Sequence, residues 1–385
     1  MIDGRQMASS AKFYLDYAKY LYNYDRIEHW EDAVDRVKNM HDYRIGDKLD
    51  ADPKARSMFE NATQMYKDKK FLGSQRALQF GGDSILKHHS KMYNCLTSYV
   101  DRVEFFQEAM YWLLSGCGAG FSVLPEYIQK LPKLQQRTKG VKTFKPEDSI
   151  EGWSDVIGVL ISSFTEENPN APYYAQPTFP EYQGYRVDFD LSGIRKQGAF
   201  ISGGFRAPGP EPLRKTVQNI EELLQDEFEQ QNSDVIDFRS IIAYDVVMHT
   251  ADAVLSGGVR RSATICIFDK NDEEMMQAKT RENFNYAKDL NKQRARSNNS
   301  ALLIRDETSK EEFENIIQYT QDFGEPGFVW ADSRKLVVNP CLSADAKVET
   351  TDGIYTMKEL SDMPQNELEM LEVPSYNEKN GDIEN

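Results

Sequence analysis

MYNCLTSYVDRVEFFQEAMYWLLSGCGAGFSVL, residues 92–124, is the stretch of sequence that decides the fold. Its first part is β-like, an amphipathic helical pattern follows, and a cluster of glycines ends that helix before a second strand-like run. Asp101 is expected to cap the helix, with Glu104 at the third helical position. The stretch therefore predicts a strand, helix, strand unit with Cys95 on its first strand.

The same alternation returns later in the chain. Residues 238–255 read as an amphipathic helix, residues 262–268 and 301–305 read as strands, and Ser309 with Glu312 opens a further helix that ends near residue 324. Repeated alternation of strand and helix predicts a parallel α/β sheet or barrel.

Two other regions differ from this pattern. Residues 1–90 carry aromatic and aliphatic residues at helical spacing and predict a helical region. Residues 125–235 are richer in Pro, Tyr and charge, and they predict an inserted, loop-rich subdomain.

Composition narrows the function classes. The formal net charge of −16 argues against a surface that coats a nucleic-acid backbone. The four cysteines are far apart, without the paired spacing of a zinc site or a disulfide scaffold, so we expect no bound metal and a reducing cytoplasmic location. The N-terminal residues lack an apolar signal region and no run is long enough to span a bilayer, so neither export nor membrane insertion is expected.

Two segments place glycines beside arginines, as a close backbone approach to a phosphate requires. They are residues 202–215 and 257–263. The candidate ligand-binding residues are Gly203, Gly204, Arg260 and Arg261. For each segment the alternative is an ordinary glycine turn with solvated charges.

A third segment, residues 292–303, combines cations with Ser and Asn side chains just before a strand. This composition suits the reading of a nucleotide's polar groups, and a plain polar loop is the alternative. Its candidate residues are Arg294, Ser297, Asn298 and Asn299.

Taken in order, eight motifs resemble those of the adenosylcobalamin-dependent (class II) ribonucleoside-triphosphate reductases. The likeness spans roughly residues 1–340, and its specificity lies in the agreement of so many motifs in one order. The motifs are SQRALQFGG, MYNCLTSYV, SGCGAGFSV, GGFRAPGPEPLR, GGVRRSA, RARSNNSALL, GEPGFVW and NPC.

The resemblance implies a fold and a reaction. Residues 91–340 would form the first half of a ten-stranded α/β barrel, after the helical region 1–90 and with residues 125–235 as an effector-binding insertion. The enzyme would convert ribonucleoside triphosphates to deoxyribonucleoside triphosphates by thiyl-radical chemistry that adenosylcobalamin initiates, with most of the cobalamin site in the missing half. In that family a loop cysteine forms the thiyl radical, and two further cysteines supply the reducing equivalents.

Residue roles follow from the same resemblance. Cys95 matches one member of the redox cysteine pair, Asn339 matches the amide that binds the ribose hydroxyls, and 294–300 resembles the segment that links effector to substrate choice. The implied partners are a ribonucleoside triphosphate, a deoxynucleoside triphosphate effector and thioredoxin, with no nucleic acid or membrane, and the complete protein would be a monomer. Cys117 and Cys266 match no catalytic position, and core packing is the preferred interpretation of both.

The chain departs from the reductase pattern at Cys341, because the glutamate expected two residues later is replaced by Ser343. Residues 341–385 hold 11 acidic residues and 3 lysines, and they resemble the start of an intein, a short all-β segment. A strand would run to Val348, with a turn at Asp352-Gly353, and a later hairpin would turn at 380–381.

In that role Cys341 is the first intein residue, and its thiol attacks the Pro340 carbonyl to form a thioester. The radical cysteine would then come from the downstream flank. The terminal intein motifs are absent, so either the intein is split and a separate C-terminal intein–reductase polypeptide completes it, or the sequence stops before them. Two alternatives stay open: a chain whose only chemistry is splicing, and a nucleotide-binding fragment without turnover.

Overall fold

The computed structural model describes residues 4–168, 170–199, 206–255 and 263–338, with short parts of the C-terminal segment. Those parts are 347–350, 352–356, 359–360, 363, 375–376 and 383–384. The chain separates into two compact units, Met1–Asn339 and Pro340–Asn385, which are described in turn.

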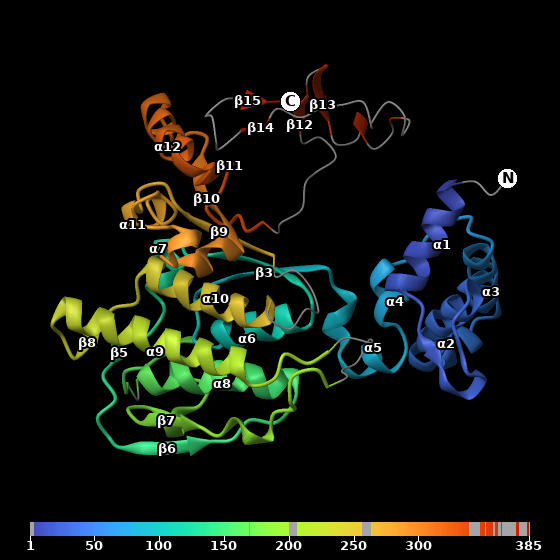
Figure 1. Cartoon of the computed structure of the whole chain (residues 1–385), viewed down its shortest axis with the longest axis horizontal. Coiled ribbons are helices and arrows are strands. Elements are labelled where there is room, and N and C mark those ends of the chain that lie inside the picture. Colours follow the sequence, from blue (N-terminus) through green and yellow to red (C-terminus); the bar gives the residue numbers. More distant parts are fainter. Residues whose placement is uncertain are drawn as a thin grey trace. The chain divides into compact units, whose positions relative to one another are not determined.

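A five-stranded parallel sheet is the centre of the first unit (Figure 1). All four neighbouring pairs run parallel, which confirms the α/β fold with a parallel sheet. That this sheet is half of a ten-stranded barrel stays a prediction. In spatial order the strands are β11 (Gly327–Ala331), β10 (Ser297–Ile304), β9 (Thr264–Asp269), β4 (Gly118–Ser122) and β3 (Cys95–Tyr99).

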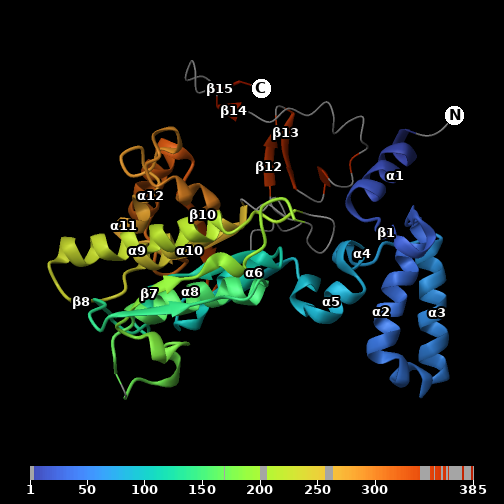
Figure 2. The same ribbon diagram turned by 60° about the horizontal axis from the view of Figure 1, so that its bottom comes forward.

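Helices cover one face of this sheet (Figures 1 and 2). Strand residues such as Phe121, Cys266 and Phe268 join the helices in one buried core that also holds Phe105 and Tyr244. The principal helices are α6 (Glu104–Leu114), α8 (Ile150–Phe164), α9 (Glu211–Gln231), α10 (Ser240–Leu255) and α12 (Lys310–Phe323).

The helix ends test two sequence predictions. Ser309 and Glu312 form the expected capping box of α12, and Gly324 ends that helix with a φ of +74°, a conformation that glycine adopts readily. The prediction for Asp101 is wrong. Helix α6 begins at Glu104 without a side-chain cap, because the Asp101 carboxylate pairs with the neighbouring Arg102 instead.

The region 125–235 is less loop-rich than expected, since it contains α8 and α9. Helix α8 lies almost wholly in the interior, since 12 of its 15 residues are buried. Four short strands complete the region, with β6 parallel to β7 and β5 antiparallel to β8. They are β5 (Leu134–Gln135), β6 (Val141–Phe144), β7 (Arg186–Phe189) and β8 (Val235–Ile236).

The N-terminal region is helical, as predicted, with a small core of its own around Val34, Val37 and Met40. Buried Arg76 joins it to the sheet region, because its guanidinium donates to the carbonyl oxygens of Tyr93, Ser115 and Gly116. The elements are α1 (Gly4–Asp16), β1 (Tyr20–Leu21), β2 (Arg26–Ile27), α2 (Trp30–Asp50), α3 (Pro53–Lys67), α4 (Gln75–Phe80) and α5 (Asp83–Lys87). Two further short helices lie elsewhere, α7 (Pro125–Ile128) and α11 (Glu273–Met276).

The second unit contains two antiparallel strand pairs. Strand β12 (Lys347–Thr350) pairs with β13 (Gly353–Thr356), and β14 (Ser375–Tyr376) pairs with β15 (Ile383–Glu384). Both pairings agree with the hairpins predicted from the sequence. Strand β13 already includes Gly353, which the sequence analysis placed in the first turn, and the second predicted turn falls on residues outside those described.

In the described part of the chain, no helix combines the length and apolar character needed to cross a bilayer.

Candidate functional site

Cys95 lies at the start of β3, on the sheet face opposite the helices. It pairs in register with Gly118 of β4, so no side chain stands beside it on that neighbouring strand. Thr97 and Tyr99 follow on the same face, because side chains alternate along a strand. Cys95 is partly exposed and Thr97 is exposed, which leaves this part of the face accessible. We call the face that carries these three residues the open face.

Segment 332–338 crosses the open face, with bends and a turn at residues 332–335 and no regular structure at 336–338. Its anchor is Arg334, whose guanidinium donates to Glu126 at 2.9 and 3.1 Å and to Asp269 Oδ2 at 2.5 Å. Burial alone would raise the pKa of Asp269, but the hydrogen bond from Arg334 lowers it below its ordinary value. Beyond the anchor, the Tyr99 hydroxyl donates to the Lys335 carbonyl oxygen at 2.8 Å.

Segment 332–338 runs along the open face in a direction that two contacts define. Lys335 contacts Tyr99 at the end of β3, whereas Val338 contacts Gly120, which is in register with Thr97. The chain therefore runs along the open face from the Tyr99 end toward the Cys95 end. Asn339 and Cys341, the other predicted catalytic residues, lie outside the described residues.

The predicted nucleotide-reading segment divides between the two sheet faces. Arg294 is buried and bound to Asp245 through two hydrogen bonds of 2.6 and 2.9 Å. Ser297 is buried against the Tyr244 hydroxyl at 2.9 Å. Its own hydroxyl donates to Asn299 Oδ1 at 2.7 Å. These three candidates thus take part in a buried network on the helix-covered side.

Asn298 is different, because it is exposed. It pairs in register with Ile265, whose side chain packs with the cluster beneath segment 332–338. Of the four candidates in this segment, Asn298 is the one that the structure places on the open face.

Part of the first glycine–arginine segment lines a cavity of about 280 Å³. Gly203, Gly204, Arg260 and Arg261 themselves lie outside the described residues. Residues 207–209 of the first segment line this cavity, and so do residues 253–254, which precede the second segment in the sequence. Residues that are distant in sequence therefore meet at a single site.

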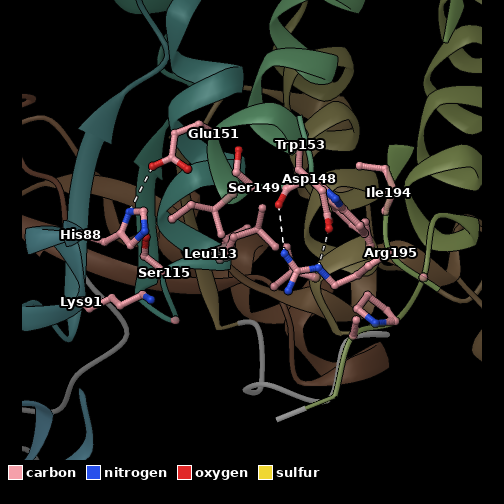
Figure 3. Close-up of a pocket in the computed structure, with 18 of the residues that line it drawn as sticks. His88, Lys91, Leu113, Ser115, Asp148, Ser149, Glu151, Trp153, Ile194 and Arg195 are labelled. Atoms are coloured by element: carbon pink, nitrogen blue, oxygen red, sulfur yellow. Dashed lines mark hydrogen bonds and ion pairs between the residues drawn. The ribbon is translucent and has the colours of Figure 1, made fainter. Parts of the chain in front are cut away.

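Figure 3 shows charged groups and an apolar wall around this cavity. His88 lies 3.1 Å from the Glu151 carboxylate, and Arg195 donates to Asp148 Oδ2 at 2.6 Å. Lys91 donates to the Ser84 hydroxyl at 3.0 Å, and burial lowers its pKa. The apolar wall consists of Leu113, Trp153 and Ile194, with Ser149 capping the N-terminus of α8 at the rim.

Sequence reasoning did not select His88, Lys91, Trp153 or Arg195. They come from separate segments, and none carries a motif that marks it. The one available signal was Ser149 before an apolar run, which is typical of a helix start, and helix starts attract anions. Cys117 and Cys266 are both buried, in agreement with core packing.

No protein-family model matches the chain. Three curated proteins are similar to this chain. The adenosylcobalamin-dependent ribonucleoside-triphosphate reductase of Lactobacillus gasseri is 24% identical, over 81% of this chain and 47% of its own length. That of Lactobacillus delbrueckii subsp. bulgaricus is 25% identical, over 83% and 48%. A probable reductase of the same description from Dictyostelium discoideum is 29% identical, over 49% and 21%.

Its relatives are adenosylcobalamin-dependent reductases. A crystal structure of a B12-dependent (class II) ribonucleotide reductase shares the fold, with a TM-score of 0.65 and 20% identity over 89% of this chain and 52% of that one. The chain spans about half the length of the two Lactobacillus relatives and of this solved structure. The comparisons do not identify the segment that follows Pro340.

Proposed function

We propose that residues 1–340 form the N-terminal half of an adenosylcobalamin-dependent reductase of ribonucleoside triphosphates. The observation that carries the proposal is the open face, on which Cys95 lies and along which segment 332–338 runs toward it. The relatives support the reaction class, since two of them align over more than four fifths of this chain.

The open face suits a thiol-dependent reduction. In the proposed reaction the ribose C2′–O bond breaks, a C2′–H bond forms, and the hydroxyl leaves as water. Cys95 and a second cysteine outside this chain each lose their S–H bond, and their sulfur atoms join in one disulfide. This oxidation of the two thiols supplies the two electrons that the reduction consumes. Asn339 would hold the ribose hydroxyls, and a dithiol reductant of the thioredoxin class would restore the thiols.

Adenosylcobalamin, when bound, supplies the radical that starts this chemistry. What this chain offers toward it is a sheet face with accessible positions at Cys95 and Thr97. We propose, as the resemblance implies, that most of the cofactor's contacts come from the part of the relatives' length that this chain does not cover.

The cavity beside α8 is the proposed effector site for a deoxynucleoside triphosphate. Trp153, Leu113 and Ile194 offer an apolar surface for a base, Lys91 and Arg195 offer positive charge for phosphates, and His88 offers an imidazole N–H. Arg195 and His88 contact carboxylates in this structure, so a triphosphate would compete with Asp148 and Glu151 for them.

The effector site can be tested on this chain by calorimetric titration with each deoxynucleoside triphosphate. Lys91→Ala should weaken binding by about tenfold, because it removes one charge-assisted contact. Lys130→Ala, a cation that does not line the cavity, is the matched control and should bind as the wild type does. Equal binding by both variants would exclude this cavity as the phosphate site.

For residues 341–385 we propose the N-terminal part of an intein, and the two hairpins of the second unit support this proposal. The Cys341 thiol would add to the Pro340 carbonyl, the peptide C–N bond would break, and a thioester and a free amine would form. Treatment with an external thiol, in the presence of candidate downstream polypeptide, should cleave the chain after Pro340. Cys341→Ala should abolish this cleavage, and Cys95→Ala should not affect it.

The reductase assignment requires the protein completed by its downstream half. This protein should form deoxyribonucleotide from ribonucleoside triphosphate only when adenosylcobalamin and a dithiol are both supplied. Turnover without adenosylcobalamin, or its absence when both are present, would refute the assignment.

A further inference from the structure

Gly120 lies in the middle of β4 and faces the backbone of segment 332–338. A methyl group on this residue would lie 1.9 Å from the Val338 carbonyl oxygen and 2.9 Å from its carbonyl carbon. Gly120 does not have the positive φ that favours glycine, so the need for glycine comes from this neighbour and not from backbone conformation.

The neighbouring segment is held both before the contact with Gly120 and at the contact itself. Arg334 fixes its start through Glu126 and Asp269, and Tyr99 binds the Lys335 carbonyl oxygen. Farther along, the side chains of Leu336 and Val338 pack against a buried cluster that includes Leu124, Ile267 and Leu302. The segment therefore lies against Gly120 because its own contacts hold it there.

We propose that Gly120 is a positioning residue: the absence of a side chain there sets the depth at which segment 332–338 lies over β4, and so the position of Val338, from which the chain continues. The consequence for turnover rests on the proposed reductase function, whereas the effect on the segment does not.

The expected displacement is large enough to affect a reaction. Ordinary contact begins near 3.4 Å, so a methyl group at Gly120 requires the Val338 carbonyl to move by about 1.5 Å. A misplacement of about 1 Å can cost a catalysed reaction about 100-fold in rate. Gly327 on β11 provides a matched control, since its added methyl would meet the Ser300 hydroxyl at 3.2 Å and backbone only at 3.6 Å.

The first measurement is hydrogen–deuterium exchange in the 385-residue chain. Gly120→Ala should speed exchange of the amides of residues 335–338 by about tenfold or more, because the segment lifts from the sheet. Gly327→Ala should leave that exchange unchanged. Unchanged protection of residues 335–338 in folded Gly120→Ala would overturn the proposal.

A double-mutant cycle covers the case in which Gly120→Ala folds poorly. Leu336→Ala loosens the segment, so in that background Gly120→Ala should shift the unfolding equilibrium constant by about tenfold less than it does alone. If Gly120→Ala alone does not fold, Leu336→Ala should restore folding. Additive effects, or no restoration, would show that the glycine is needed for a reason other than the segment.

The second measurement uses the completed protein. Gly120→Ala should lower kcat for nucleotide reduction by about 100-fold with little change in KM or in effector binding, and Gly327→Ala should retain activity. If the wild-type protein reduces no nucleotide, the proposed function fails, and the exchange measurement still decides the role of Gly120. Full kcat in Gly120→Ala would contradict the proposal.

Discussion

The two faces of the central sheet hold their side chains in different ways. On the helix-covered face, Arg294 and Asp245 form a buried ion pair and Cys266 lies fully buried. On the open face, Cys95 is partly exposed, and in the described residues segment 332–338 crosses β4 beside it. The first arrangement stabilises the fold, while the second leaves Cys95 partly exposed beside a segment that Arg334, Leu336 and Val338 hold in place.

Cys266 and Cys95 show the difference between the two faces most directly. Burial raises the pKa of the Cys266 thiol well above its ordinary value, so this group stays protonated and unreactive. Cys95 has a glycine beside it on the neighbouring strand and lies on the accessible side. Cysteines on adjacent parts of one sheet can therefore differ in role because of the face on which they lie.

The largest effect on stability is expected from the helix-covered face. Asp245→Ala would leave the buried Arg294 guanidinium without its carboxylate, and the free energy of unfolding should fall by about 3–5 kcal/mol. Urea denaturation followed by circular dichroism measures this change. A loss below about 1 kcal/mol would show that water or another group replaces the carboxylate, and that the two faces are less different than proposed.

A smaller effect is expected from the open face. Tyr99→Phe removes the hydroxyl that donates to the Lys335 carbonyl oxygen, so the free energy of unfolding should fall by about 0.5–1.5 kcal/mol. Exchange of the amides near Lys335 should speed up, while the amides of α10 keep their protection. Loss of protection across α10 would mean that the segment supports the whole fold.

The helix-covered face should also respond to pH through His249 on α10. Burial lowers the pKa of His249 below its ordinary value of 6.5, Asp245 and Asp252 oppose this shift, and Arg294 adds to it. The unfolded chain therefore takes up this proton first, and stability falls as the pH drops below 6.5, by at most about 1.4 kcal/mol per pH unit.

His249→Gln should remove this contribution. The measurement is the unfolding free energy of both proteins between pH 7.5 and pH 5, chosen as roughly one unit above and below the ordinary histidine range. Parallel curves for the two proteins would exclude His249 as the source of the slope.

The smallest effect is expected at an exposed ion pair, which serves as the reference for the buried one. Arg305 and Asp332 lie 2.9 Å apart, but their side chains are 60% and 86% exposed. Asp332→Ala should change the free energy of unfolding by less than about 1 kcal/mol, because solvent screens the pair. If Asp332→Ala lowered the free energy of unfolding as much as Asp245→Ala does, burial could not explain why the two ion pairs differ in strength.

Local patterns in the sequence were sufficient for much of the sheet region. The strand, helix, strand unit of residues 92–124 and the capping box at Ser309 depend on neighbours only a few residues apart, so they could be predicted. Helix α8 was not predicted, because its apolar run stands within a Pro-, Tyr- and charge-rich region whose composition is typical of loops.

The candidate site was predictable only in part. Cys95 was selected through its motif, and its catalytic role stays a prediction. Residues 207–209 of the first glycine–arginine segment and residues 253–254, just before the second, line one cavity. The cavity's own His88, Lys91 and Trp153 come together only in the folded chain. Likewise, a glycine pattern around Gly120 was visible in the sequence, but its partner Val338 is distant along the chain, so only the fold shows why glycine is needed.

The central claim is that the open face carries the chemistry and the helix-covered face does not. It is tested most directly by multiple-turnover reduction of a ribonucleoside triphosphate in the completed protein, with Cys95→Ala and Cys266→Ala compared at equal folded concentration. The account predicts that Cys95→Ala loses dithiol-dependent turnover and that Cys266→Ala keeps it. Wild-type turnover in Cys95→Ala would contradict the account.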